Sequence, residues 1–166
     1  MSPIQKNRSI LPNEPMSSND VGVVLAHARA LRRAARAGTM QSLLRGKKLA
    51  LLSEADNGDA VLFTRAATEL GAHVAYIRPS LTELSTPENV QNTARMLGRL
   101  YDAVECQGMP SALVYQVRCD AGVPIYDGIA TCHHPTAKLA EQLGGDAPMV
   151  ENRRFVLQAV LLSTIT

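Results

Sequence analysis

The sequence predicts an α/β fold, namely a doubly wound, four-stranded parallel sheet with helices on both faces, in a single domain. Short apolar runs that suit buried strands alternate along the chain with longer segments whose apolar residues recur at helical spacing. Alternating βα units of this kind form parallel sheets with short connections. The chain of 166 residues can bury one hydrophobic core without disulfide or metal support, and its length argues against a multidomain enzyme.

The first helix follows a segment rich in proline and small polar residues. Residues 1–19 carry three prolines and a Ser-Ser-Asn run, so we expect a flexible N-terminal arm there. From residue 21 onward, apolar side chains recur at helical spacing, with Asn19 or Asp20 as the N-cap and Gly38 as the stop. The α/β domain is expected to span residues 20–143.

The remaining strands and helices alternate. The sequence Ser85-Thr86-Pro87-Glu88 is typical of a helix start, and Gly71 is expected to close the helix before it. Residues 144–166 are expected to form a linker and a final helix, 150–165, whose apolar face packs back on the domain. The strands are expected at residues 49–52, 74–77, 103–106 and 123–126, with helices around residues 62–70, 87–100, 113–117 and 135–143.

Charge and aromatic content argue against a nucleic-acid partner. The formal net charge is +2, although residues 21–48 hold seven basic side chains and no acidic one. The arginines of this segment fall on the polar side of the first helix, where charges are usually solvated, and we interpret them in this way. Aromatic residues make up only 4% of the chain, which leaves few stacking platforms for single strands. The four helix arginines are Arg29, Arg32, Arg33 and Arg36.

The cysteines predict a reduced, cytoplasmic protein. Three widely spaced cysteines form no Cys-x-x-Cys pair, so neither a disulfide framework nor structural zinc is expected. The adjacent Cys132, His133 and His134 cannot by themselves surround a tetrahedral ion, and His133 is interpreted as a surface residue. We therefore predict no metal and no cofactor. No apolar run reaches the roughly 18 to 20 residues of a membrane span, so no membrane partner is expected.

Ligands of open parallel sheets bind beyond the carboxyl ends of the strands. Any chemistry is therefore expected in the loops at residues 53–59, 78–86, 106–110 and 127–135.

Several segments, in their order along the chain, resemble the N-terminal, carbamoyl-phosphate-binding domain of the aspartate and ornithine carbamoyltransferases. The resemblance covers about residues 20–143 and implies that domain's fold and its trimeric association. The segments are Leu44-Arg45-Gly46-Lys47-Lys48-Leu49-Ala50-Leu51-Leu52, Glu69-Leu70-Gly71-Ala72-His73, Asn92-Thr93-Ala94-Arg95-Met96-Leu97, Gly122-Val123-Pro124-Ile125-Tyr126-Asp127-Gly128 and His134-Pro135-Thr136.

Residues 150–162 resemble the C-terminal helix of the same family, which returns to pack on the N-terminal domain. Here these residues follow Gly144-Gly145 almost directly. The resemblance therefore implies that the family's second, amino-acid-binding domain is missing between Leu143 and Pro148.

The phosphate site of the family departs most from its usual form. The family's Ser-Thr-Arg-Thr-Arg loop aligns with Asp56-Asn57-Gly58-Asp59-Ala60, so two positive charges are replaced by two negative ones. Each carboxylate near a phosphate costs on the order of 1 to 4 kcal/mol, whereas a helix dipole contributes roughly 0.3 to 1 kcal/mol. The expected arginine after the third strand is Gln107, and the glutamine of the His-Pro-x-Gln motif is Ala137.

His134 alone matches the family's carbamoyl-contacting set, and it is equally explained as a hydrogen-bonded loop histidine. The acidic side chains near residue 56 favour either a cationic ligand or a simple role in capping the next helix. No residue is predicted to be catalytic. The candidate ligand-binding residues are Asp56, Asn57, Gly58, Asp59, Gln107 and His134.

These features predict a carbamoyltransferase-like protein that is catalytically inactive and acts by binding or assembly. The alternative is a residual carbamoyltransferase, or a carbamoyl-phosphate-binding subunit, that a partner chain completes. The expected partners are further copies of this chain, as a trimer, or a full-length relative, together with a small-molecule ligand.

Overall fold

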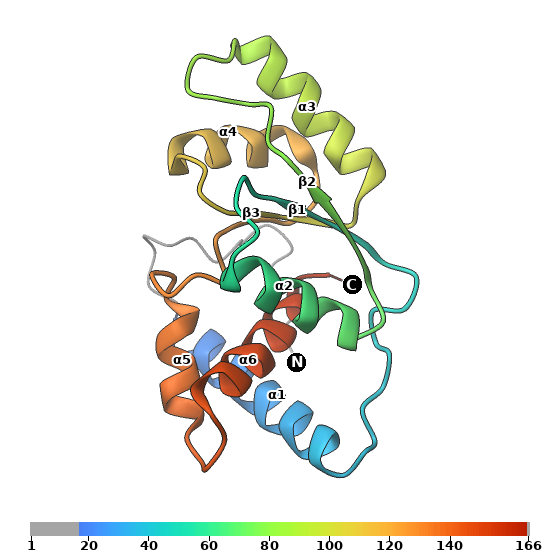
Figure 1. The fold of residues 1–166 in the computed structure, drawn as a ribbon, viewed down its shortest axis with the longest axis vertical. Coiled ribbons are helices and arrows are strands. Elements are labelled where there is room, and N and C mark those ends of the chain that lie inside the picture. Colours follow the sequence, from blue (N-terminus) through green and yellow to red (C-terminus); the bar gives the residue numbers. More distant parts are fainter. Residues whose placement is uncertain (1–16, 166) are drawn as a thin grey trace.

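A four-stranded, fully parallel sheet forms the centre of the molecule, with strand order β2-β1-β3-β4 (Figure 1). The computed structural model describes residues 17–165. The expected N-terminal arm lies almost wholly outside the described residues. The predicted doubly wound sheet with helices on both faces is confirmed. The strands are β1 (Lys48–Leu52), β2 (His73–Ile77), β3 (Ala103–Cys106) and β4 (Ile125–Asp127).

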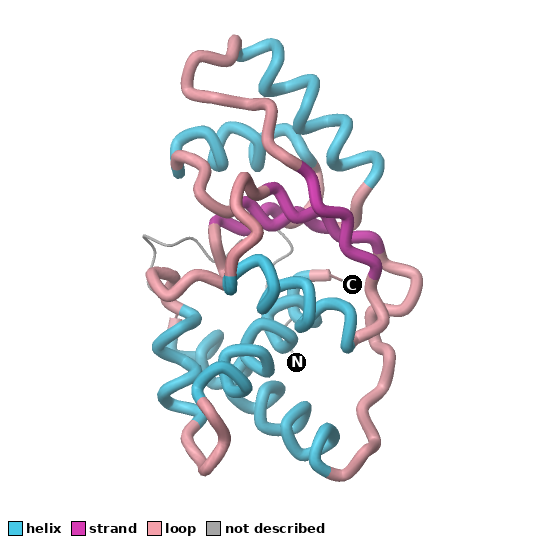
Figure 2. Tube along the Cα trace, viewed as in Figure 1, coloured by secondary structure: helices cyan, strands magenta, loops and turns pink. Residues whose placement is uncertain are grey.

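Within the described residues, six helices cover the sheet in two unequal layers (Figure 2). The pair α3 and α4 covers one face, and α1, α2, α5 and α6 cover the other, each layer enclosing its own cluster of buried apolar side chains. No helix within residues 17–165 has the length and apolar character needed to cross a bilayer. The helices are α1 (Ser18–Arg36), α2 (Gly58–Glu69), α3 (Pro87–Leu100), α4 (Ser111–Ala121), α5 (Thr136–Leu143) and α6 (Met149–Thr164).

Side-chain caps explain where α1, α2 and α3 start. The N-cap of α1 is Ser17, whose hydroxyl accepts a hydrogen bond from the Asp20 backbone N–H. The expected caps Asn19 and Asp20 lie inside the first turn instead, so the predicted boundary is late by two to three residues. Thr86 caps α3 directly before a proline, as its sequence predicts.

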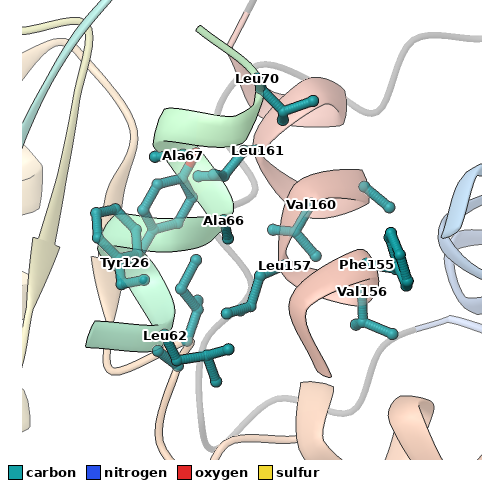
Figure 3. Packing of buried hydrophobic residues seen from close by; sticks show 14 of the residues in the cluster. Leu62, Ala66, Ala67, Leu70, Tyr126, Phe155, Val156, Leu157, Val160 and Leu161 are labelled. Atoms are coloured by element: carbon teal, nitrogen blue, oxygen red, sulfur yellow. The ribbon is translucent and has the colours of Figure 1, made fainter. Parts of the chain in front are cut away.

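The last helix, α6, docks on α1, α2 and α5 and closes the larger layer. Figure 3 shows Leu157, Val160 and Leu161 of α6 facing the apolar side of α2. Ala66 of α2 has a small side chain on this side of the helix. All four side chains are buried. Burial of a leucine or valine stabilises a fold by roughly 1.5 to 3 kcal/mol, so this helix contributes substantially to the core. In the structure, the final helix therefore packs back on the domain.

Polar contacts fix the position of α6 on α2. Arg154 Nε lies 3.1 Å from Glu69 Oε2 of α2, and Gln158 Nε2 donates to the Ala66 carbonyl at 3.2 Å and to Glu69 at 3.0 Å. Gln158 is fully buried and Arg154 nearly so. These bonds offset part of the cost of burying polar groups, although Gln158 Oε1 has no hydrogen-bond partner among the described residues. They also select one register between the two helices.

Arg32 corrects the interpretation of the α1 arginines as solvated charges. Its side chain is half-buried, and Nη1 donates to the Gly144 carbonyl at 2.6 Å and to Asn152 Oδ1 at 3.2 Å. Arg29 and Arg33, in contrast, are exposed as predicted. Arg32 therefore ties α1 to the turn between α5 and α6 rather than serving a surface role.

Gly98 of α3 lies against the carboxyl end of α4. A Cβ atom added at this position would stand 1.8 Å from the Ala121 carbonyl oxygen. The two helices can approach this closely only because residue 98 has no side chain.

Candidate functional site

A cleft of about 810 Å³ opens at the carboxyl ends of the strands. It lies where β1 and β3 are neighbours but their connections run to opposite sides of the sheet, which is the topological switch point at which such sheets bind ligands. All four loops predicted to carry chemistry contribute to its wall. The lining residues with polar side chains are Ser53, Glu54, Asn57, Asp59, Thr82, Glu83, Gln107, Thr131, Cys132 and His133.

The N-terminus of α2 points into this cleft, but its own N-cap occupies its amide donors. Asn57 Oδ1 accepts hydrogen bonds from the backbone N–H groups of Asp59 and Ala60, both at 3.1 Å. Asparagine is a strong N-cap because its side-chain oxygen reaches these positions. Two of the donors with which a helix N-terminus holds a phosphate are therefore already satisfied.

The charge of the cleft wall is negative. Glu54, Asp59 and Glu83 line it, and no lysine or arginine is among the described lining residues. Arg153 of α6 lies behind the wall, with Nη2 at 4.0 Å from Asp59 Oδ1, and the same nitrogen donates to the Ala130 carbonyl. Arg153 thus offsets one carboxylate of the three.

Asp56 lies in the loop before α2 and Gly58 is the first residue of that helix, but neither forms part of the wall. Both are exposed. A Cβ atom at Gly58 would meet nothing within 4 Å, so the backbone here leaves room for a larger side chain.

Gln107 lies at the inner end of the cleft and is 5% exposed. Its Nε2 donates to the Asp59 carbonyl at 3.2 Å and lies 3.4 Å from Glu105 Oε2. Its Oε1 has no hydrogen-bond partner among the described residues. An unsatisfied buried acceptor is costly, and it is one of the features by which a ligand site is found.

Glu105 is a buried residue next to the site whose structural role the sequence did not predict. This β3 side chain is fully buried, and its two oxygens accept hydrogen bonds from the backbone N–H groups of Ile129 and Ala130, both at 3.1 Å. Burial raises the pKa of the Glu105 carboxyl to about 8, against these hydrogen bonds, which lower it. Glu105 thereby holds the loop after β4 against the end of β3. A signal was present, because a carboxylate interrupts an otherwise apolar strand.

The two adjacent histidines have different surroundings. His134 is 2% exposed, and its Nδ1 accepts the backbone N–H of Thr136 at 3.2 Å. His133, which is exposed, lines the cleft. The structure therefore brings Asn57, Asp59 and Gln107 of the candidate residues together, and it places His134 beneath the loop as a hydrogen-bonded residue.

The cysteines do not form a common site. Cys106 is buried on β3, where burial raises the pKa of its thiol, while Cys119 and Cys132 are exposed. All three are free thiols. Within residues 17–165, no group of three or more His, Cys, Asp or Glu side chains is arranged to hold a metal ion.

Comparison with known proteins relates this geometry to a family. The family model for the aspartate/ornithine carbamoyltransferase, carbamoyl-P binding domain, matches residues 8–144. The ornithine carbamoyltransferase of Actinobacillus pleuropneumoniae is 38% identical over 148 residues, which cover 89% of this chain and 43% of that protein. The family model ends before α6, so the resemblance of this helix to the family's C-terminal helix stays a prediction.

Solved structures agree with this relationship. Ornithine carbamoyltransferase from Pyrococcus furiosus superposes with a TM-score of 0.66 at 26% identity, covering 76% of this chain and 41% of that one. The Burkholderia thailandensis enzyme gives a TM-score of 0.70 at 20% identity over 82% of this chain and 47% of its own, a likeness that shows the shared fold. The chain spans less than half the length of these relatives. It belongs to the aspartate/ornithine carbamoyltransferase family and corresponds to the carbamoyl-phosphate-binding domain.

Proposed function

We propose that this chain is a carbamoyltransferase-type domain that acts by binding or assembly and transfers no carbamoyl group. The observation that carries the proposal is the wall of the cleft, which has three carboxylates and no lysine or arginine among its described lining residues. The amide donors of Asp59 and Ala60 are also taken by Asn57. A dianionic substrate therefore meets repulsion where it needs cations and free donors.

Titration of the chain with carbamoyl phosphate tests this proposal. We expect no binding up to about 1 mM, because each carboxylate near a phosphate costs on the order of 1 to 4 kcal/mol. Isothermal titration calorimetry measures this directly. A dissociation constant in the tens of micromolar would contradict the proposal.

A charge-restoring variant sharpens the experiment. Gly58→Arg/Asp59→Thr should bind carbamoyl phosphate at least about tenfold more tightly than the wild-type chain, since it adds a guanidinium and removes a carboxylate. Open space at Gly58 leaves room for the arginine. Gly58→Gln/Asp59→Thr is the matched control, with a similar side-chain length and no guanidinium. Equal affinities for the two variants would show that the added guanidinium does not contribute to binding in this cleft.

A second candidate function is a carbamoyl-phosphate-binding subunit, or a residual carbamoyltransferase, that a partner chain completes. Two observations favour it. Leu84 at the rim of the cleft is 94% exposed and offers an apolar contact for a partner chain, and the matching relatives are more than twice as long as this chain. An assay with ornithine or aspartate, with and without a full-length relative, separates the two candidates. Product formation in the mixture at a rate above that of the relative alone, with none from this chain alone, supports the second and contradicts the first.

The proposal also concerns the assembly of this chain. We infer a trimer or a complex with a full-length relative, and a cytoplasmic location in keeping with three free thiols. Exposed apolar side chains on β2 and α3, namely Tyr76, Met96 and Leu100, supply surface for such contacts. Light scattering that finds only monomer at micromolar concentration would remove the homotrimer.

A further inference from the structure

We propose that a groove beside the cleft binds a medium-chain alkyl carboxylate, with the alkyl chain in the groove and the carboxylate at an arginine rim. The groove lies between α3 and the loop that follows β2, and the rim consists of Arg78, Arg95 and Arg99. The inference goes beyond the proposed function and does not depend on it, because it concerns a different pocket and a different ligand. It is carried by the apolar lining of the groove and by the charge of its rim.

The groove has a volume of about 260 Å³ and an apolar floor. Met96 of α3 stands at its edge with 51% of its surface exposed. Small-molecule sites are concave and mostly apolar, with a few charged or polar groups that orient the ligand. The groove therefore suits an alkyl chain. Its floor includes half-buried side chains packed against the smaller core cluster, namely Ile77, Leu81, Tyr101 and Met109.

The charge of the rim selects anions over cations. Arg78 lines the groove itself, whereas Arg95 and Arg99 line a second pocket on α3, about 280 Å³ in volume, that shares Met96 and Leu100 with the groove. No aspartate or glutamate is among the described residues that line either pocket. Charges of one sign around a pocket concentrate ligands of the opposite sign.

The rim arginines also lack acidic partners within the chain. All three are exposed, and none forms an ion pair within residues 17–165. Arg95 and Arg99 stand one turn apart on α3, where like charges repel each other. Asp102, just after this helix, accepts the backbone N–H of Lys48 at 2.8 Å. A carboxylate can accept two parallel hydrogen bonds from one guanidinium, so a carboxylate head supplies the missing partner.

Calorimetric titration of the full chain with octanoate, at low ionic strength, tests the inference. We expect a dissociation constant of about 1 mM or tighter. Octylammonium, which has the same chain and the opposite charge, should bind at least about tenfold more weakly. Acetate should also bind at least about tenfold more weakly, because it lacks the chain. Absence of octanoate binding, or equal or tighter binding of octylammonium or acetate, would overturn the inference.

A pair of charge variants tests the rim. Arg78→Gln/Arg99→Gln should weaken octanoate binding at least about fivefold. The control Arg29→Gln/Arg33→Gln removes the same net charge from exposed positions on α1, in the opposite layer (Figure 1), and should leave binding unchanged. Equal losses in both variants would show non-specific attraction and contradict the proposed site. Thermal unfolding of each variant establishes that it is folded.

A second pair of variants tests the groove. Met96→Glu places a carboxylate at the edge of the groove, where it repels octanoate and competes for the rim arginines, so binding should weaken at least about tenfold. Met149→Glu is the matched control, because Met149 is 48% exposed at the start of α6 and lines neither pocket. Octanoate affinity that is unchanged in Met96→Glu, or lowered equally in both variants, would contradict binding in this groove.

The outcomes separate the inference from the proposed function. Met96 and Leu100 also belong to the surface proposed for assembly, so octanoate competes with any assembly that uses them. Tight carbamoyl phosphate binding, or a chain that stays monomeric, contradicts the proposed function and leaves the octanoate prediction unchanged. Absence of octanoate binding refutes the groove site and leaves the proposed function unchanged.

Discussion

Replacing Gly98 by alanine is expected to destabilise the fold by about 3 kcal/mol or more, among the largest effects of adding a single methyl group. The new Cβ would lie 1.8 Å from the Ala121 carbonyl oxygen, and the obstacle is backbone rather than a movable side chain. Helices α3 and α4 must therefore separate. The gain in helix propensity, about 1 kcal/mol, is too small to compensate.

Urea unfolding followed by circular dichroism measures this loss. Gly22→Ala is the matched control, because Gly22 is exposed on α1 and a Cβ there meets nothing within 4 Å. The control should be neutral or more stable than wild type by up to about 1 kcal/mol. If Gly98→Ala were as stable as Gly22→Ala, the close packing of α3 on α4 would be wrong.

Stability is expected to fall as pH rises, because of Glu105. Its pKa is about 8 in the folded chain and 4.5 ordinarily, so the folded state binds more protons between these values. The stabilisation that comes from this preferential protonation of the folded state is fully present below the pKa of the unfolded chain. It is lost as pH rises through the pKa of the folded chain. The expected loss between pH 5 and pH 9 is on the order of 3 to 5 kcal/mol.

Denaturation at pH 5, 7 and 9 measures this dependence. Glu105→Gln removes the titrating group and should flatten the curve, while the exposed Glu141→Gln should retain the wild-type slope. Because Glu105→Gln places an amide group opposite backbone N–H donors, that variant is also expected to be less stable at pH 5. A wild-type slope in Glu105→Gln would show that other groups carry the dependence.

Much of the fold follows from local patterns, since the strands are largely apolar runs and α1, α2 and α3 begin at side-chain caps. One shift is in β4, which begins at Ile125 rather than residue 123. Pro124 has no N–H to give to a ladder, although its carbonyl accepts the Val104 N–H at 3.0 Å. Local reasoning therefore locates a strand better than it locates the strand's first residue.

The site was predictable as a set of loops and less so as a set of contacts. Switch-point topology places the cleft at the loops that line it, and the acidic turn before α2 is visible in the sequence. The roles of Glu105 and Arg32 depend on partners 24 and 112 positions away, which no local pattern specifies. Long-range contacts of this kind are the part that one sequence does not reveal.

The packing of α6 against α1 has a consequence for biosynthesis. The ribosome makes α1 first and α6 last of the described elements, yet the two helices share one buried layer. Apolar side chains of α1 and α2, such as Val24 and Phe63, therefore stay without their final partners until residue 161 has left the exit tunnel. While translation continues, the nascent chain exposes this apolar surface to chaperones and to aggregation.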